Sequence, residues 1–212
     1  MDPKQLRIVV SGPVGAGKTT LVRALAERLQ VPVVPENMRQ IYALLHDYTT
    51  IKSSYLSSQE ETQRALDHLM EAFFKWADER ERIYAGNTGF VADRWEADLL
   101  DLWLKLFAEV RCDARTQKLY SMMIDRSRSM SFAITLPPSN FSVESMNEDG
   151  LPRKRSFNLT LLSHVVTGGL IRLCPALKVI NVNNTTLSVE ERLDQIYRIV
   201  MNSDSDVRAR SK

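Results

Sequence analysis

The sequence has few of the residues and segments that mark exported, membrane-spanning or metal-binding proteins. Its two cysteines, Cys112 and Cys174, do not lie at the spacing of a metal or redox site. No apolar run approaches the ~18 residues that a helix needs to cross a bilayer. Residues 1–6 also lack the apolar core of a signal peptide. We therefore expect a reduced, cytoplasmic chain without a membrane partner.

An excess of charge of one sign is also missing. The 28 Lys and Arg residues nearly balance 26 Asp and Glu residues, so the net charge of +2 argues neither for nor against a nucleic-acid partner. The three histidines, His46, His68 and His164, are scattered and do not form a metal-binding pattern. Hydrophobic residues make up 44% of the 212 residues, which is enough to build a full core.

Short β-branched runs alternate with segments of helical periodicity along most of the chain. Strands are expected at 6–10, 31–34, 88–92, 130–136 and 177–182. Helices are expected at 19–29, 37–45, 58–85, after Asp93, at 116–126, at 157–173 with an interruption at Gly168-Gly169, and at 188–201. This order predicts an α/β three-layer sandwich with a five-stranded parallel sheet.

The remaining segments define the expected boundaries of the domain. The polar, Ser- and Thr-rich segment 47–58 is typical of a loop, and Ser58 with Glu61 forms a capping-box pattern that opens the next helix. One domain is expected over 1–202, with a lid at 139–156. Residues 203–212 contain almost no apolar side chains, so we expect them to form a disordered tail.

The first expected strand is followed directly by a glycine-rich loop and then by a helix. The loop reads Gly12, Pro13, Val14, Gly15, Ala16, Gly17, Lys18, Thr19 and Thr20. Glycines allow a loop to curl so that successive backbone N–H groups surround a phosphate, and the helix N-terminus adds a partial positive charge. In this P-loop pattern Lys18 reaches the β- and γ-phosphates and the hydroxyl of Thr19 binds Mg²⁺, so we expect ATP and Mg²⁺ as cofactors.

Two acidic residues follow expected strands, where the ends of parallel strands face a ligand crevice. Glu36 would accept a proton from an attacking hydroxyl or bind substrate; alternatively it stabilises a helix N-terminus. Asp93 would hold Mg²⁺ or orient the nucleophile, and Arg94 would grip a substrate phosphate. The alternative for this pair is a structural ion pair. All three residues are therefore candidates for both catalysis and substrate binding.

Several further residues are candidates with weaker support. Arg39 would face a substrate phosphate, and Trp95 would either line the acceptor pocket or belong to the core. In the lid, Arg153 or Arg155 would close over the γ-phosphate, unless the basic run is merely solvated. The segment 126–128, Arg-Ser-Arg, is more typical of a solvated helix end.

Together these motifs resemble the P-loop nucleoside and nucleotide kinases, the group of thymidylate kinase and the deoxynucleoside kinases. The P-loop at 12–19, the acid Glu36 after a strand, the Asp93-Arg94-Trp95 motif and the basic lid at 150–155 carry the resemblance. It implies an ATP-dependent kinase in nucleotide metabolism that phosphorylates a nucleoside, a nucleotide or a related acceptor. It also implies a homodimer, formed through helix 59–85 or the helix after Asp93.

Departures from this family leave the acceptor open. Asn37-Met38-Arg39 replaces the usual continuation of the Glu motif, and the Asp149-Gly150-x-x-Arg153 lid also looks like that of small bacterial and phage P-loop kinases. A first alternative is a kinase acting on a hydroxyl of a nucleic acid, suggested by the lid, Arg126, Arg128 and the basic tail. A second alternative is a regulatory P-loop ATPase or nucleotide sensor.

Overall fold

The computed structural model describes residues 2–138, 157–182 and 188–202. The chain divides into two compact units. The first unit contains residues 1–35 and 87–212, and the second contains residues 36–86. The expected lid at 139–156 and the expected tail at 203–212 lie outside the described residues.

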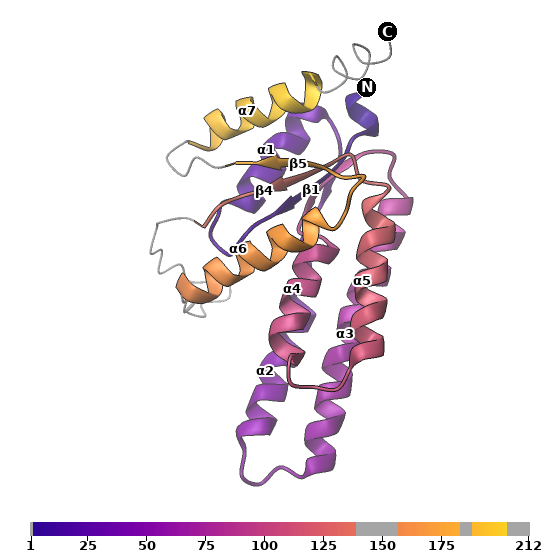
Figure 1. Ribbon diagram of the computed structural model, residues 1–212, viewed down its shortest axis with the longest axis vertical. Coiled ribbons are helices and arrows are strands. Elements are labelled where there is room, and N and C mark those ends of the chain that lie inside the picture. The colour runs from indigo at the N-terminus through magenta and orange to yellow at the C-terminus, as the bar shows by residue number, and fades with distance from the viewer. Residues whose placement is uncertain (1, 139–156, 183–187, 203–212) are drawn as a thin grey trace. The chain divides into compact units, whose positions relative to one another are not determined.

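The first unit is built on a five-stranded sheet in which all strands are parallel (Figure 1). The strand order is β2-β3-β1-β4-β5, so β1 lies at the centre. The central strands β1, β3 and β4 are buried, as expected for a parallel sheet that is covered on both faces. The predicted α/β sandwich is therefore confirmed. The strands are β1 (Arg7–Ser11), β2 (Val33–Val34), β3 (Phe90–Asp93), β4 (Phe132–Thr135) and β5 (Lys178–Asn181).

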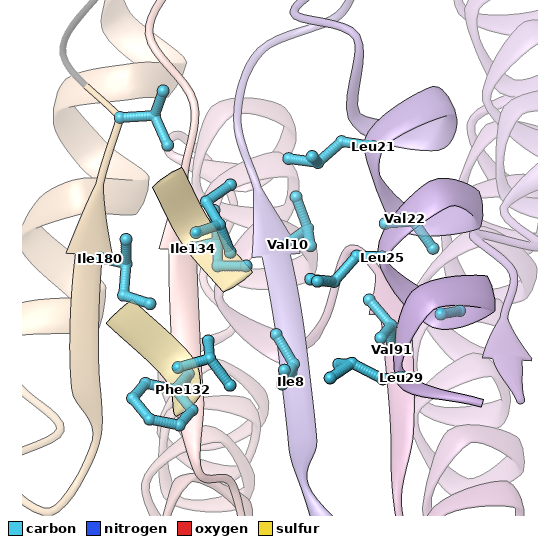
Figure 2. Packing of buried hydrophobic residues seen from close by; sticks show 14 of the residues in the cluster. Ile8, Val10, Leu21, Val22, Leu25, Leu29, Val91, Phe132, Ile134 and Ile180 are labelled. Atoms are coloured by element: carbon cyan, nitrogen blue, oxygen red, sulfur yellow. The ribbon is translucent and has the colours of Figure 1, made fainter. Parts of the chain in front are cut away.

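Helices cover both faces of this sheet (Figure 1). On one face lie α1 (Lys18–Leu29) and α7 (Val189–Asn202), and on the other lie α4 (Glu96–Phe107), α5 (Asp113–Ser127) and α6 (Phe157–Arg172); a 3₁₀ turn, η1 (Pro3–Gln5), precedes β1. Figure 2 shows how Leu21, Leu25 and Leu29 of α1 pack on Ile8 and Val10 of β1. This packing holds the N-terminus of α1 at the end of β1.

The second unit is a helical hairpin of α2 (Arg39–Ser53) and α3 (Gln59–Ala85), which pack against each other. The hydroxyl of Ser58 accepts the N–H of Glu61 at 3.1 Å, so the helix start predicted there is confirmed. The loop predicted at 47–58 is wrong, because α2 continues to Ser53. The hydroxyls of Thr49 and Thr50 donate to the carbonyl of His46, which lets these polar residues remain helical.

The interruption predicted in the helix at 157–173 is also wrong. The α6 helix runs without a break through Gly168 and Gly169. A glycine in a helix costs only about 1 kcal/mol relative to alanine. The buried side chains of Thr167 and Ile171 anchor the helix on either side of the pair. None of the helices in the described part of the chain is both long and apolar enough to cross a membrane.

Candidate active site

The phosphate loop leaves the end of β1 and enters α1 with three glycines at positive φ: Gly12 at 151°, Gly15 at 85° and Gly17 at 82°. Gly12 has a second constraint besides its φ. A Cβ on this residue would lie 2.9 Å from the carbonyl oxygen of Leu136, just after β4. The loop therefore begins next to the end of β4. Between β1 and β4 the strand order reverses, because β2 and β3 lie on one side of β1 whereas β4 and β5 lie on the other. Ligands of open parallel sheets commonly bind at such a point.

Lys18 is the first residue of α1, and its side chain folds back over the loop. Its ammonium Nζ donates to the carbonyl oxygen of Pro13 at 2.8 Å, and the residue is only 6% exposed. An ammonium group held over a curled loop at a helix N-terminus places positive charge where phosphate oxygens bind. Contact between Lys18 and the β- and γ-phosphates stays a prediction.

Thr19 and Asp93, which the sequence analysis named as Mg²⁺ ligands, meet at the neighbouring ends of β1 and β3. The parallel pairing of these strands sets Val10 beside Asp93. The hydroxyl of Thr19 then donates to Oδ2 of Asp93 at 2.6 Å. Among the residues that the structure describes, no three His, Cys, Asp or Glu side chains gather around a possible metal position. One hydroxyl with one carboxylate nevertheless fits Mg²⁺, which takes few protein ligands beside phosphates and water.

Arg94 follows Asp93 in a conformation that is unusual for a residue with a side chain. Its φ is 65°, in the left-handed region, and its backbone N–H donates to the carbonyl of Val10 at 3.0 Å. Its guanidinium Nη1 donates to Oδ1 of Asp98 at 3.2 Å. A left-handed backbone costs about 1–3 kcal/mol in a non-glycine residue, and such residues concentrate at functional sites. This turn therefore supports Arg94 as a site residue.

Asp98, which the sequence analysis did not select, connects the end of β1 to the turn after β3. Its Oδ2 accepts the hydroxyl of Ser11 at 2.6 Å and the backbone N–H of Trp95 at 3.3 Å. Burial raises the pKa of Asp98, while the charges of Arg94 and Lys18 and the hydrogen bonds from Ser11 and Trp95 oppose that rise. The sequence contained one signal that could have identified Asp98, because this carboxylate lies in the first turn of a helix that begins just after the end of a strand.

Trp95 is fully buried in the structure, and its indole N–H donates to the hydroxyl of Ser11 at 3.0 Å. The residue therefore supports the end of β1 from within the core, and contact with an acceptor remains a prediction. The solvated helix end predicted at 126–128 is wrong for Arg126. This side chain is 9% exposed, and its Nη1 donates to Oε1 of the buried Glu96 at 2.6 Å.

Glu36 and Arg39 belong to the second unit, so their roles beside the phosphate loop remain predictions. Within that unit, Glu36 is half-buried and its Oε1 accepts the hydroxyl of Tyr42 at 3.5 Å. The backbone carbonyl of Glu36 accepts the indole N–H of Trp76 at 2.8 Å, which fixes the chain on α3. Arg39 begins α2 and is exposed. The lid residues Arg153 and Arg155 lie outside the described residues.

One further contact to the phosphate loop comes from the C-terminal helix. Nη1 of Arg192 on α7 lies 3.5 Å from the carbonyl oxygen of Ala16 and donates to it. On the same side, Arg28 of α1 pairs with Asp194 and stacks on the ring of Tyr197 at 4.4 Å. The sequence analysis predicted the helix but not these contacts, because nothing in the local pattern links α7 to the loop.

Comparison with known proteins supports the fold described above. A family model described as an AAA domain matches residues 7–162, which is more than half of the chain. No curated protein matches the sequence. The family match covers the phosphate loop and β3.

Solved structures resemble the chain over nearly its whole length. Deoxyadenosine kinase from M. mycoides, with the products dCMP and dCDP bound, has a TM-score of 0.60 at 15% identity, covering 93% of this chain and 100% of that chain. Thymidylate kinase from Candida albicans has a TM-score of 0.59 at 12% identity, covering 95% and 93%. YorR from Bacillus subtilis, in complex with phosphorylated GDP, has a TM-score of 0.50 at 14% identity, covering 93% and 97%. The chain belongs to the AAA-domain family, and its fold is that of the P-loop nucleoside and nucleotide kinases.

Proposed function

We propose that the chain is an ATP- and Mg²⁺-dependent kinase that transfers the γ-phosphate to a nucleoside, a nucleotide or a related hydroxyl or phosphate acceptor. The observation that carries this proposal is the 2.6 Å contact between the hydroxyl of Thr19 and the carboxylate of Asp93. It supports the proposal because a hydroxyl oxygen and a carboxylate oxygen, both of which suit Mg²⁺, lie next to the glycine-rich loop, and Arg94 follows Asp93 immediately. The kinase folds of the structural neighbours also support a kinase function.

Each residue around the loop has a separate task in this proposal. Bound ATP and Mg²⁺ would supply the transferable phosphoryl group and the cation that neutralises its charge. The ammonium of Lys18 would leave the carbonyl of Pro13 and bind phosphate oxygens instead. Thr19 and Asp93 would hold the cation through their oxygens. The guanidinium of Arg94 would orient an acceptor phosphate or hydroxyl close to the transferred group.

The acceptor side also involves residues whose placement beside the loop is a prediction. Glu36 would accept the proton of an attacking hydroxyl, and Arg39 and Trp95 would help to bind the acceptor. Arg153 or Arg155 would spread the charge of the transition state. A homodimer remains part of the proposal on the resemblance alone. The nucleic-acid alternative loses one of its supports, because Arg126 is buried against Glu96 and is not available to track a backbone.

The direct test is a panel of acceptors incubated with γ-labelled ATP and Mg²⁺: nucleosides, nucleoside monophosphates, and DNA and RNA strands. We expect label on a monomer and none on the polymers. Lys18→Ala should lower this transfer by at least about 10²-fold, because it removes charge stabilisation at the transferred group. The matched control is Lys4→Ala, since Lys4 is an exposed lysine at the start of the fold.

Three results would contradict the proposal. A Lys18→Ala variant that keeps most of the wild-type transfer rate would remove the phosphate loop from the mechanism. Label on polymers alone would favour the nucleic-acid kinase. ATP hydrolysis at full rate without any acceptor would favour the regulatory ATPase.

A further inference from the structure

Asp98 lies beneath the turn that carries Asp93 and Arg94, and it contacts both sides of the candidate site. We propose that Asp98 is a positioning residue. It holds the guanidinium of Arg94 in a fixed position relative to Ser11, the last residue of β1 before the phosphate loop. The part of this inference that concerns the acceptor rests on the kinase function proposed above.

The two oxygens of Asp98 are used for different partners. Oδ1 accepts Nη1 of Arg94 at 3.2 Å. Oδ2 accepts the hydroxyl of Ser11 at 2.6 Å and the backbone N–H of Trp95 at 3.3 Å. Ser11 is the last residue of β1, directly before the phosphate loop, and its hydroxyl also accepts the indole N–H of Trp95. One carboxylate therefore joins the nucleotide side of the site to the acceptor side.

Burial makes this connection rigid. Ser11 and Trp95 are 0% exposed and Asp98 is 4% exposed, so water cannot easily replace a broken contact. Two cations influence Asp98, Arg94 from the turn after β3 and Lys18 from α1. The guanidinium of Arg94 is charged, and hydrogen bonds from a charged donor are stronger than bonds between neutral groups, which suits a residue that must keep this side chain in place.

A plain helix cap would explain only part of this arrangement. A carboxylate at the third residue of a helix commonly accepts the N–H of the residue before the helix, as Asp98 does from Trp95. Capping needs neither Oδ1 nor the hydroxyl of Ser11. The contact with Arg94 is informative because the backbone of Arg94 is left-handed, at a φ of 65°. The pair therefore holds the side chain of a residue whose backbone is itself constrained.

The substitution Asp98→Asn distinguishes the contact with Arg94 from the contacts with Ser11 and Trp95. An amide has one accepting oxygen, which can take two hydrogen bonds. Placed where Oδ2 lies, it keeps the bonds from Ser11 and from the N–H of Trp95. The amide nitrogen then faces the guanidinium of Arg94, donor against donor. Asp98→Asn therefore removes the contact with Arg94 and keeps the contact with Ser11, whereas Ser11→Ala removes the contact with β1 and keeps the contact with Arg94.

The test compares both variants in steady-state kinetics, with MgATP and the best acceptor from the panel. Asp98→Asn should raise the KM for the acceptor on the order of tenfold, the loss of one charge-assisted hydrogen bond, and change the affinity for MgATP less than about twofold. Ser11→Ala should show the reverse pattern. Asp125→Asn is the control, because Asp125 pairs with Arg128 on the surface, and it should change neither constant.

Equal changes of both constants in the two variants would overturn the proposal, because they would indicate only a general loosening of the core. No change in Asp98→Asn would overturn it as well. A urea-unfolding cycle of Arg94→Ala, Asp98→Asn and the double variant needs no acceptor. The double variant should lose little more stability than the less stable single variant. Additive losses would overturn the inference even if the wild type phosphorylates no acceptor, a result that by itself rejects only the proposed function.

Discussion

The helices α4 and α7 begin with the same local motif in opposite surroundings. Asp98 and Glu191 each occupy the third helical position, and each accepts the N–H of the residue before the helix, Trp95 at 3.3 Å and Ser188 at 2.8 Å. Burial raises the pKa of Asp98, whereas the hydrogen bonds from the backbone and hydroxyl of Ser188 lower the pKa of the exposed Glu191. The motif alone therefore does not determine its role.

The neighbouring acids repeat this contrast. Glu96, the first residue of α4, is buried and pairs with Arg126 of α5. Glu190, in the first turn of α7, is exposed. At α7 the acids stabilise a helix end in water, which is a local effect. At α4 they connect separate elements, because each buried charge must find a partner within the protein. The three predictions below test this difference.

The largest effect is expected for the buried pair of Glu96 and Arg126. Arg126→Ala should lower the free energy of unfolding by about 3–5 kcal/mol, because it leaves a buried carboxylate without its cation. Arg128→Ala, which removes a partner of the exposed Asp125, should cost at most about 1 kcal/mol. Urea unfolding measures both. Similar losses in the two variants would show that the buried pair contributes no more to stability than the exposed pair.

The second prediction concerns pH. The raised pKa of Asp98 means that the folded state binds more protons there than the unfolded state, so this contribution favours folding at low pH and is lost as the pH rises from about 3.8 through the raised pKa. Glu191 has the opposite sign. Its contribution is present above about 4.5 and is lost as the pH falls through its lowered pKa.

The measurement is urea unfolding of wild type, Asp98→Asn and Glu191→Gln across the acid range. The stability difference between wild type and Asp98→Asn should fall with rising pH, and that between wild type and Glu191→Gln should rise. Slopes of the same sign would contradict the opposite contributions expected from Asp98 and Glu191. The dependence of each stability difference on pH is the test, because each substitution also alters hydrogen bonds and thereby changes the difference at every pH.

The smallest effect is expected at the exposed helix start. Ser188→Ala removes the hydroxyl that accepts the N–H of Glu191 at 3.2 Å and should cost about 0.5–1 kcal/mol. Ser188→Asn should recover most of this loss, since asparagine also accepts at a helix start. Thermal unfolding of the two variants is sufficient. An equal loss in both would show that the hydroxyl does not cap α7.

Local chemistry explains which parts of the site could be predicted from the sequence. The glycine-rich loop was predicted because a short motif specifies its backbone, and Asp93 was selected because it ends a buried strand. The binding of Mg²⁺ by Thr19 and Asp93 stays a prediction. Asp98 was missed because its partner Ser11 lies 87 residues away, and only the pairing of β1 with β3 brings the two together. Nothing in the sequence around Arg126 distinguishes a buried arginine from the exposed Arg128 two residues later.

The fold shows the same division. The five strands were predicted because buried parallel strands leave β-branched runs in the sequence. The length of α2 was missed because serine and threonine are typical of loops, although their hydroxyls can also bond to the preceding helical turn. The continuity of α6 depends on packing around Thr167 and Ile171, which overrides the low helix propensity of two glycines.

The pairing of Val10 with Asp93 has a consequence for the folding of the chain. A slip of β3 by one residue would place Ala92 beside Val10, turn the side chain of Asp93 to the opposite face and leave Thr19 without its partner. A misregistered chain would therefore lack the contact between Thr19 and Asp93 on which the proposed magnesium site depends. A ligand that binds only the native state stabilises it by mass action. Under the proposed function, binding of nucleotide and magnesium would therefore favour the chain with the correct strand alignment.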